Sequence, residues 1–156
     1  MSLSNTTDQY HDLYDNFRWQ VPSKFNIAEV CCHRWSGDGA RIALRCEDQD
    51  GNTATLSYQE LQLEANRLSN ALRHLGAQRE DRIAIILPQR LETAVAHIAC
   101  YQLGAIAMPM SFLFGPDALE YRLQDSKASI AIVDQAGLAN LLNSRDRCPE
   151  IGRAHV

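Results

Sequence analysis

The clearest pattern of apolar and polar positions lies between residues 57 and 76. Ser57 is followed three residues later by Glu60, an arrangement in which each side chain satisfies a free backbone N–H of a first helical turn. Apolar residues then recur every three or four positions, as they do on the buried face of a helix. They are Leu61, Ala65, Leu68, Leu72 and Leu75. Gly76 can adopt the left-handed conformation that ends many helices, so we expect the helix to stop there.

After Gly76, short apolar runs alternate with segments of helical character. We expect strands at 82–87, 105–108 and 129–134, and helices at 91–104, 116–126 and 137–143. The runs are apolar at consecutive positions, which is typical of strands buried on both faces of a parallel sheet. This alternation predicts an α/β fold, namely a partial doubly wound, mainly parallel sheet with helices on both faces.

The ends of the expected strands are the places where a ligand would bind. In sheets of this kind, ligands collect outside the carboxyl ends of the strands, so the loops after Leu87 and Met108 are candidates. The run 105–108 follows a glycine stop at Gly104, and we expect it to be an interior strand that ends at Pro109.

Smaller elements are expected before residue 57. Residues 8–19 predict a short aromatic helix that ends ahead of Pro22, and a second helix is expected to begin near Phe25. Strand-like runs at 42–47 and 53–58 flank the turn Asp-Gln-Asp-Gly-Asn and predict a β-hairpin. The sheet is therefore expected to be preceded by N-terminal helices and a hairpin.

Composition narrows the class of protein. The 156 residues, 46% of them apolar, are enough for the core of one domain. The net charge of −4 without a basic cluster gives no reason to expect nucleic acid or a membrane surface as a partner. No apolar run approaches the roughly 20 residues of a membrane span, and the polar start lacks the features of a signal peptide. A cytoplasmic location is expected, and the oligomeric state stays open.

Motifs for metal binding or catalysis are missing from the sequence. The five cysteines have no regular spacing, and Cys31, Cys32 and His33 are adjacent, so their side chains point in different directions and packing is favoured over a zinc site. No phosphate-loop, dinucleotide, nucleophile-elbow or H-E-x-x-H motif occurs. His97 lies in an apolar helix and is interpreted as a packed or partly exposed histidine. Composition, periodicity and spacing alone leave the function open.

Three stretches, at 25–35, 56–89 and 92–134, resemble the start of the adenylate-forming enzymes, the superfamily of acyl-CoA synthetases, luciferases and peptide-synthetase adenylation domains. A Leu-x-Tyr-x-Glu-Leu pattern is present at Leu56, Tyr58, Glu60 and Leu61. A Leu-x-Ala-Gly-Ala-x-x-x-Pro pattern is matched at Gly104, Ala105 and Pro109, with Gln102 and Leu103 in place of the usual Lys-Ala. Among these enzymes, the chain looks most like acyl-CoA synthetases of the acetyl-CoA or medium-chain type.

The resemblance implies a two-step reaction. A carboxylate would attack ATP to give an acyl-adenylate and pyrophosphate, and the thiol of coenzyme A would then displace AMP. In this superfamily the groups that bind ATP and Mg²⁺ begin at a loop of the type S-G-T-T-G-x-P-K, which this sequence lacks. Residues 1–149 are therefore expected to be the N-terminal part of such a domain, without catalytic residues and inactive alone. The implied partners are a small-molecule carboxylate and coenzyme A.

Two further expectations concern particular residues. The resemblance implies that Phe114 and Gly115 line the groove for the coenzyme A nucleotide, although a glycine turn before Pro116 at the start of a helix accounts for the same residues. Residues 150–156, Glu-Ile-Gly-Arg-Ala-His-Val, read like the translation of a common sequencing adapter, which predicts a non-native tail; an ordinary tail is the alternative.

Two alternative functions stay open. One is another adenylate-forming ligase, such as an aryl-CoA ligase or a peptide-synthetase domain. The other is a small non-catalytic α/β module that binds a nucleotide or a protein.

Overall fold

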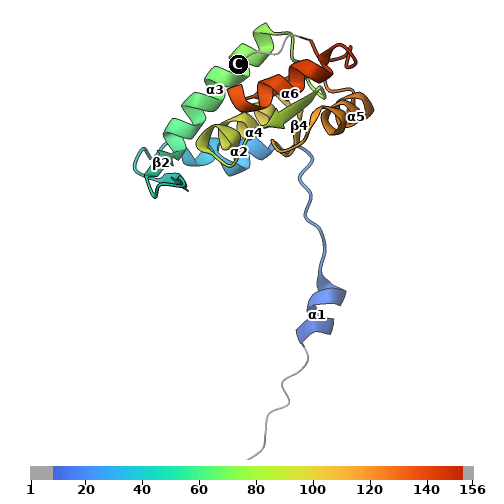
Figure 1. Cartoon of the computed structure of the whole chain (residues 1–156). Helices are drawn as coiled ribbons and strands as arrows, with labels where there is room; N and C mark the ends of the chain where they lie inside the picture. Colours follow the sequence, from blue (N-terminus) through green and yellow to red (C-terminus); the bar gives the residue numbers. More distant parts are fainter. Residues whose placement is uncertain (1–8, 153–156) are drawn as a thin grey trace, which may run out of the picture.

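The computed structural model describes residues 9–152 (Figure 1). In chain order, the elements are α1 (Gln9–Asn16), α2 (Ile27–Cys31), the 3-10 helix η1 (His33–Trp35), β1 (Ile42–Glu47), β2 (Thr53–Ser57), α3 (Tyr58–His74), β3 (Arg82–Ile86), α4 (Leu91–Leu103), β4 (Ile106–Pro109), α5 (Pro116–Ser126), β5 (Ile130–Val133) and α6 (Gln135–Arg145). Helix α1 stands apart from the other elements, at the end of an extended segment. Within residues 9–152, no helix has both the length and the apolar character that crossing a bilayer requires.

Three parallel strands form the main sheet in the order β4-β3-β5. The chain passes from β3 to β4 through α4, and then returns across β3 to β5 through α5. Because crossovers of this kind are right-handed, two crossovers in opposite directions place their helices on opposite faces of the sheet. The predicted α/β fold with a doubly wound parallel sheet is confirmed, as are the preceding helices and the hairpin of β1 and β2.

The alternation of side chains along β3 builds two cores. Ile83 and Ile85 are almost fully buried against α2, α3 and α4. Ala84 and Ile86 point to the other face and pack against α5 and α6. A strand that is covered on both faces must be apolar at every position, which is why its sequence reads as a continuous apolar run.

Helices α3, α4 and α5 all end in the same way. A residue just beyond each helix has a positive φ: 93° at Gly76, two residues after α3, 67° at Gly104, directly after α4, and 52° at Lys127, directly after α5. In each case that residue donates its backbone N–H to a carbonyl three residues back, and the next residue donates to the carbonyl five residues back. The next residue is a buried alanine every time, at positions 77, 105 and 128, and a strand follows within a few residues. This helix stop therefore sets where β3, β4 and β5 begin.

Arg82 connects the middle strand to the end of α5. Its Nε atom lies 2.8 Å from the carbonyl oxygen of Ser126, and its Nη2 atom lies 2.7 Å from that of Lys127. Carbonyl groups in the last turn of a helix lack a helical donor and carry partial negative charge. The guanidinium group of Arg82 supplies both the hydrogen-bond donors that these carbonyl groups lack and a positive charge that offsets their partial negative charge.

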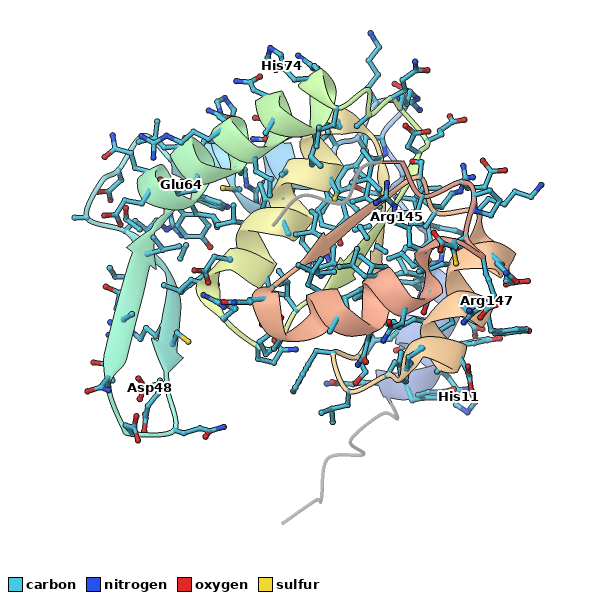
Figure 2. The ribbon with its side chains drawn as sticks, turned by 45° about the horizontal axis from the view of Figure 1, so that its top comes forward. His11, Asp48, Glu64, His74, Arg145 and Arg147 are labelled. Atoms are coloured by element: carbon cyan, nitrogen blue, oxygen red, sulfur yellow. The ribbon has the colours of Figure 1, made fainter. Side chains whose placement is uncertain are left out.

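A capping box starts α3 as expected. The Ser57 hydroxyl accepts the Glu60 N–H at 3.2 Å, and Glu60 Oε2 accepts the Ser57 N–H at 2.8 Å. The pKa of Glu60 is lowered because its carboxylate accepts hydrogen bonds from both the Ser57 N–H and the Ser57 hydroxyl, which favour the ionised form. The box ties the first turn of α3 to the end of β2, and the hairpin projects from that point, with Asp48 at its tip (Figure 2).

Some expected details differ from the structure. In the described part of the chain β4 is an edge strand, so the expectation of an interior strand is wrong for this sheet. The apolar run indicated burial, but strand order is set by the direction of the crossovers. Leu75 is 39% exposed because it is the cap residue, where the chain turns away from the face of α3. Helix α6 begins two residues earlier than expected, since the Asp134 carboxylate accepts the Gly137 N–H.

The segment 150–156 is only partly described. Ile151 is buried in the core under α5 and α6, and the Gly152 N–H lies 2.9 Å from the Ser129 carbonyl oxygen. Residues 153–156 lie outside the described residues, as does residue 8 of the first expected helix. That 150–156 are non-native stays a prediction.

The Lys127→Gly variant should be more stable than the parent chain by about 0.5–1 kcal/mol, because a left-handed residue with a side chain is strained and glycine is not. Gly76→Ala is the matched reverse change. A Cβ there would meet no atom within 4 Å, so its cost of about 1 kcal/mol comes from the backbone alone. The midpoint of urea unfolding measures the stability change in both variants. A lower midpoint for Lys127→Gly than for the parent chain would contradict this account.

Candidate functional site

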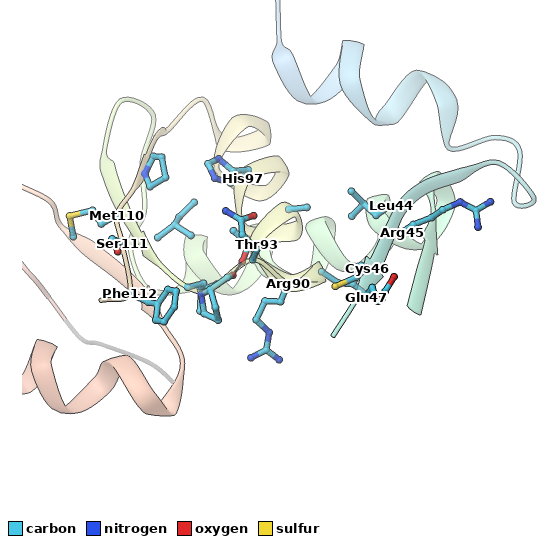
Figure 3. A pocket seen from close by; sticks show the side chains of 17 residues that line it. Leu44, Arg45, Cys46, Glu47, Arg90, Thr93, His97, Met110, Ser111 and Phe112 are labelled. Carbon is cyan, nitrogen blue, oxygen red and sulfur yellow. Dashed lines mark hydrogen bonds between the residues drawn. The ribbon is translucent and has the colours of Figure 1, made fainter. Parts of the chain in front are cut away.

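A cavity of about 780 Å³ lies at the carboxyl ends of β3 and β4 (Figure 3). One wall is residues 44–47 of β1, and the opposite wall is residues 109–112, at the end of β4 and in the loop after it. The loop 87–91 and the first two turns of α4 lie between them. This is where the sequence placed a candidate site, at the loops after Leu87 and Met108. The helices that follow β3 and β4 cover opposite faces of the sheet, so their loops diverge and leave a crevice.

An ion pair lies at the start of α4. The Arg90 Nε and Nη2 atoms lie 2.7 and 2.9 Å from the two carboxylate oxygens of Glu92. This bidentate hydrogen bonding lowers the pKa of Glu92 and raises the pKa of Arg90. Both side chains are about half exposed, so the pair is solvated and contributes little to stability. Arg90 and Arg45 are the two cationic residues of the lining, and guanidinium groups suit phosphate and carboxylate ligands.

The loop between β3 and α4 is fixed by Thr93. Its hydroxyl donates to the Pro88 carbonyl oxygen at 2.6 Å, and its backbone N–H donates to the Arg90 carbonyl oxygen at 3.1 Å. These bonds close the loop over the first turn of α4. The position of Arg90 at the mouth of the cavity follows from them.

His97 lies one helical turn beyond Thr93, on the same side of α4. Its Nδ1 atom is 3.2 Å from the Tyr101 hydroxyl, and the ring lines the cavity (Figure 3). Burial lowers the pKa of His97 below its usual 6.5, because the charged imidazolium is less well solvated there. From the sequence, His97 was expected to be a packed or partly exposed histidine, and its side chain is indeed partly buried. The structure places it at the cavity, which its spacing of four from Thr93 could have indicated.

The chemistry of the lining is mixed. Leu44, Leu87 and Met110 supply apolar surface, while Thr93, Ser111 and His97 supply polar groups. Such a cavity suits a small molecule that has an apolar part and a polar or anionic part. Phe112 also lines the cavity, and its side chain is partly exposed.

The two residues implied by the resemblance lie beside this cavity and not in its lining. Phe114 packs against the core of α5 and α6, and the Arg122 guanidinium lies 4.2 Å from its ring centre. Gly115 is the N-cap of α5 with an ordinary φ of −72°, and a Cβ there would meet nothing within 4 Å. The turn and helix start expected at Pro116 are therefore present. The contact of Phe114 and Gly115 with coenzyme A stays a prediction.

Residues 9–152 contain no group of three or more His, Cys, Asp or Glu side chains that could hold a metal ion. Cys32 is buried and its thiol pKa is raised by burial, whereas Cys31 is exposed. The His33 side chain is 60% exposed and lies 3.9 Å from Glu29. The three neighbouring side chains therefore point to different surroundings, as adjacent residues must.

Comparison with known proteins identifies the class. The sequence pattern of the AMP-binding enzymes matches residues 32–155, which is most of the chain. The protein belongs to this family, the adenylate-forming enzymes that the resemblance indicated.

Particular relatives are acyl-CoA synthetases. The acetyl-coenzyme A synthetase of Streptomyces coelicolor is 36% identical over 77% of this chain, and that of Novosphingobium aromaticivorans is 30% identical over 96%. The chain spans only 19% and 24% of these two relatives.

Solved structures agree with the fold. An acyl-CoA synthetase of Brucella canis superimposes with a TM-score of 0.83 and 25% identity, covering 93% of this chain and 28% of that one. An anthranilate CoA ligase in complex with anthranoyl-AMP gives a TM-score of 0.75, also with 25% identity, and covers 86% of this chain and 25% of that one.

Replacing His97 by Gln should make stability less sensitive to acid. Because burial lowers the folded-state pKa, the unfolded chain binds a proton more readily as the pH falls through 6.5, and stability is lost below that pH. The His97→Gln variant lacks this loss. This loss of stability is measured from melting temperatures between about pH 8 and pH 5, the range in which histidine titrates. His33→Gln, at an exposed histidine, is the control. Parallel profiles for the parent and His97→Gln would contradict the burial effect.

Proposed function

We propose that this chain is the N-terminal part of an ATP-dependent acyl-CoA synthetase. The complete protein would convert a carboxylate, ATP and coenzyme A to acyl-CoA, AMP and pyrophosphate, in a cytoplasmic setting. The observation that carries the proposal is the family match over residues 32–155, together with acetyl-coenzyme A synthetases that are 30–36% identical over most of the chain.

In this proposal residues 1–149 provide a scaffold and one binding region. ATP and Mg²⁺ would be held by the phosphate loop and by later residues that lie outside this sequence. The chain would be inactive alone. Its own contribution would be the surface after β4, where Phe114 and Gly115 contact the coenzyme A nucleotide, next to the cavity with its two arginines.

A second candidate is an aryl-CoA ligase, and the superposition on the anthranilate CoA ligase favours it. The two candidates share the fold and the thioester-forming step, and they differ in the carboxylate. Acetate and anthranilate are therefore the substrates that separate them.

The test uses the longer protein that contains this sequence, purified with ATP, Mg²⁺, coenzyme A and either acetate or anthranilate. Release of AMP that requires both the carboxylate and coenzyme A would support a synthetase, and the preferred acid would choose between the two candidates. The 156-residue chain is assayed beside it and should release none. A longer protein without a phosphate loop, or without carboxylate-dependent AMP release, would favour a non-catalytic binding module instead.

Gly115→Ala in the active longer protein should raise the KM for coenzyme A and leave the KM for ATP unchanged. The added methyl group strains nothing in this chain, so a change in KM reports a contact with the ligand. Phe114→Ala should raise the same KM at least about fivefold if its ring stacks on the adenine. Tyr121→Ala, at an exposed ring on α5, is the control. An unchanged KM in both variants, with a raised KM in Phe112→Ala, would move the site into the cavity.

A further inference from the structure

Helix α6 indicates on which side of β5 the chain continues. Crossovers between parallel strands are right-handed, so a helix on the same face as α5 carries the chain in the same direction as α5 does, from β4 past β3 to β5. Leu141 of α6 and Leu119 of α5 are buried in one core, on the opposite face of the sheet from α4. A strand that follows α6 is therefore expected beyond β5, at the outer edge of the sheet.

The last described residues have already reached that edge. Ile151 is 5% exposed and packs in the core under α5 and α6. The Gly152 N–H donates to the carbonyl oxygen of Ser129 at 2.9 Å, and Ser129 directly precedes β5. The chain thus arrives at the amino end of β5, which is the point where a parallel partner strand would start.

The hydrogen bonds of β3 show which groups of β5 point outward. The Ile85 carbonyl accepts the Met110 N–H at 2.9 Å, on the β4 side, so the adjacent residue Ala84 faces β5. The register partner of Ala84 is Ala131, and in a parallel ladder a residue bonds to the two neighbours of its partner. The N–H groups of Ala131 and, two residues further on, of Val133 therefore point away from β3.

These two N–H groups are covered but unpaired within residues 9–152. Ala131 is 2% exposed and Val133 is 6% exposed, and no backbone acceptor in the described chain bonds to either N–H on this edge. A buried backbone N–H without an acceptor is costly and therefore rare. The Ser129 hydroxyl, at the start of the same edge, is also buried without a hydrogen-bond partner among the described residues. Three polar groups along one edge thus lack a partner.

The outer edge of β4 is less suited to an added strand. Ile106 and Met110 donate their N–H groups toward β3, so the residues that face outward are Ala105, Ala107 and Pro109. The Ala105 N–H already donates to a carbonyl of α4, and proline has no N–H. Only Ala107 can donate there, which leaves β5 as the edge where the sheet can be extended.

We propose that the outer edge of β5 takes up a fourth parallel strand, formed by the chain that directly follows Gly152. In the 156-residue chain this segment is 153–156. Backbone groups make the contacts, so the strand does not depend on whether these side chains are native. The proposal is independent of the synthetase reaction, because no residue of this edge lines the cavity.

Amide hydrogen exchange, followed by NMR, tests the proposal in the 156-residue chain and in a shortened chain that ends at Gly152. In the added strand, the Val133 N–H would donate to the carbonyl of residue 154. It should therefore exchange at least about tenfold more slowly in the 156-residue chain than in the shortened one. The Ala107 N–H, on the outer edge of β4, is the internal reference and should exchange equally in both chains.

Proline substitutions test the register of the added strand. Because Gly152 donates to β5, the N–H two residues later, at Ala154, would face β5, and the N–H of His155 would point away. Ala154→Pro should raise the exchange rate of Val133 to that of the shortened chain, since proline cannot donate to the ladder. His155→Pro is the matched control and should leave the exchange of Val133 slow.

Equal exchange of Val133 in the two chains, or equal effects of the two prolines, would overturn the proposal. Circular dichroism and melting curves check that each chain is folded. If the 156-residue chain is unfolded, exchange is measured by mass spectrometry in the longer protein that contains this sequence. The Val133 N–H should be protected there, and rapid exchange would overturn the proposal. None of these outcomes depends on AMP release, so this proposal and the proposed function can fail separately.

Discussion

The helix stops at residues 76, 104 and 127 are the constraint on which the rest of the fold depends. At each stop the chain enters a left-handed conformation, closes two hydrogen bonds back onto the helix and buries an alanine. The strand that follows then begins one to five residues after that alanine. Since three strands begin in this way, their carboxyl ends also fall together, and the loops that leave them meet at one edge of the sheet.

The cavity at that edge is formed by two separate parts of the fold, the parallel sheet and the β1–β2 hairpin. Its floor comes from the ends of β3 and β4, and its closing wall comes from the hairpin. The doubly wound sheet alone would leave an open crevice. The hairpin closes it because the capping box at Ser57 and Glu60 fixes the angle between β2 and α3, while the backbone N–H of Tyr58 donates to the carbonyl of Arg41.

Sequence patterns predicted the local features well because those depend on neighbouring residues. The capping box, the glycine stops, the apolar strands and the helix start at Pro116 all follow from contacts within about one helical turn. The edge position of β4 and the wall formed by 44–47 depend on contacts between distant segments. The same limit explains the site: the strand-end rule found the loops, and the spacing of four from Thr93 could have linked His97 to them, but nothing local linked the hairpin to them.

The hairpin makes no backbone ladder with the parallel sheet, because the two sheets are separate in the described chain. One side of the cavity is therefore held by side-chain packing and by the short connection between β2 and α3, since Ala43, Leu44 and Leu56 are partly buried against the main core. A bound molecule that touches both sides of the cavity would add contacts between the hairpin and the parallel sheet where no backbone hydrogen bond joins them.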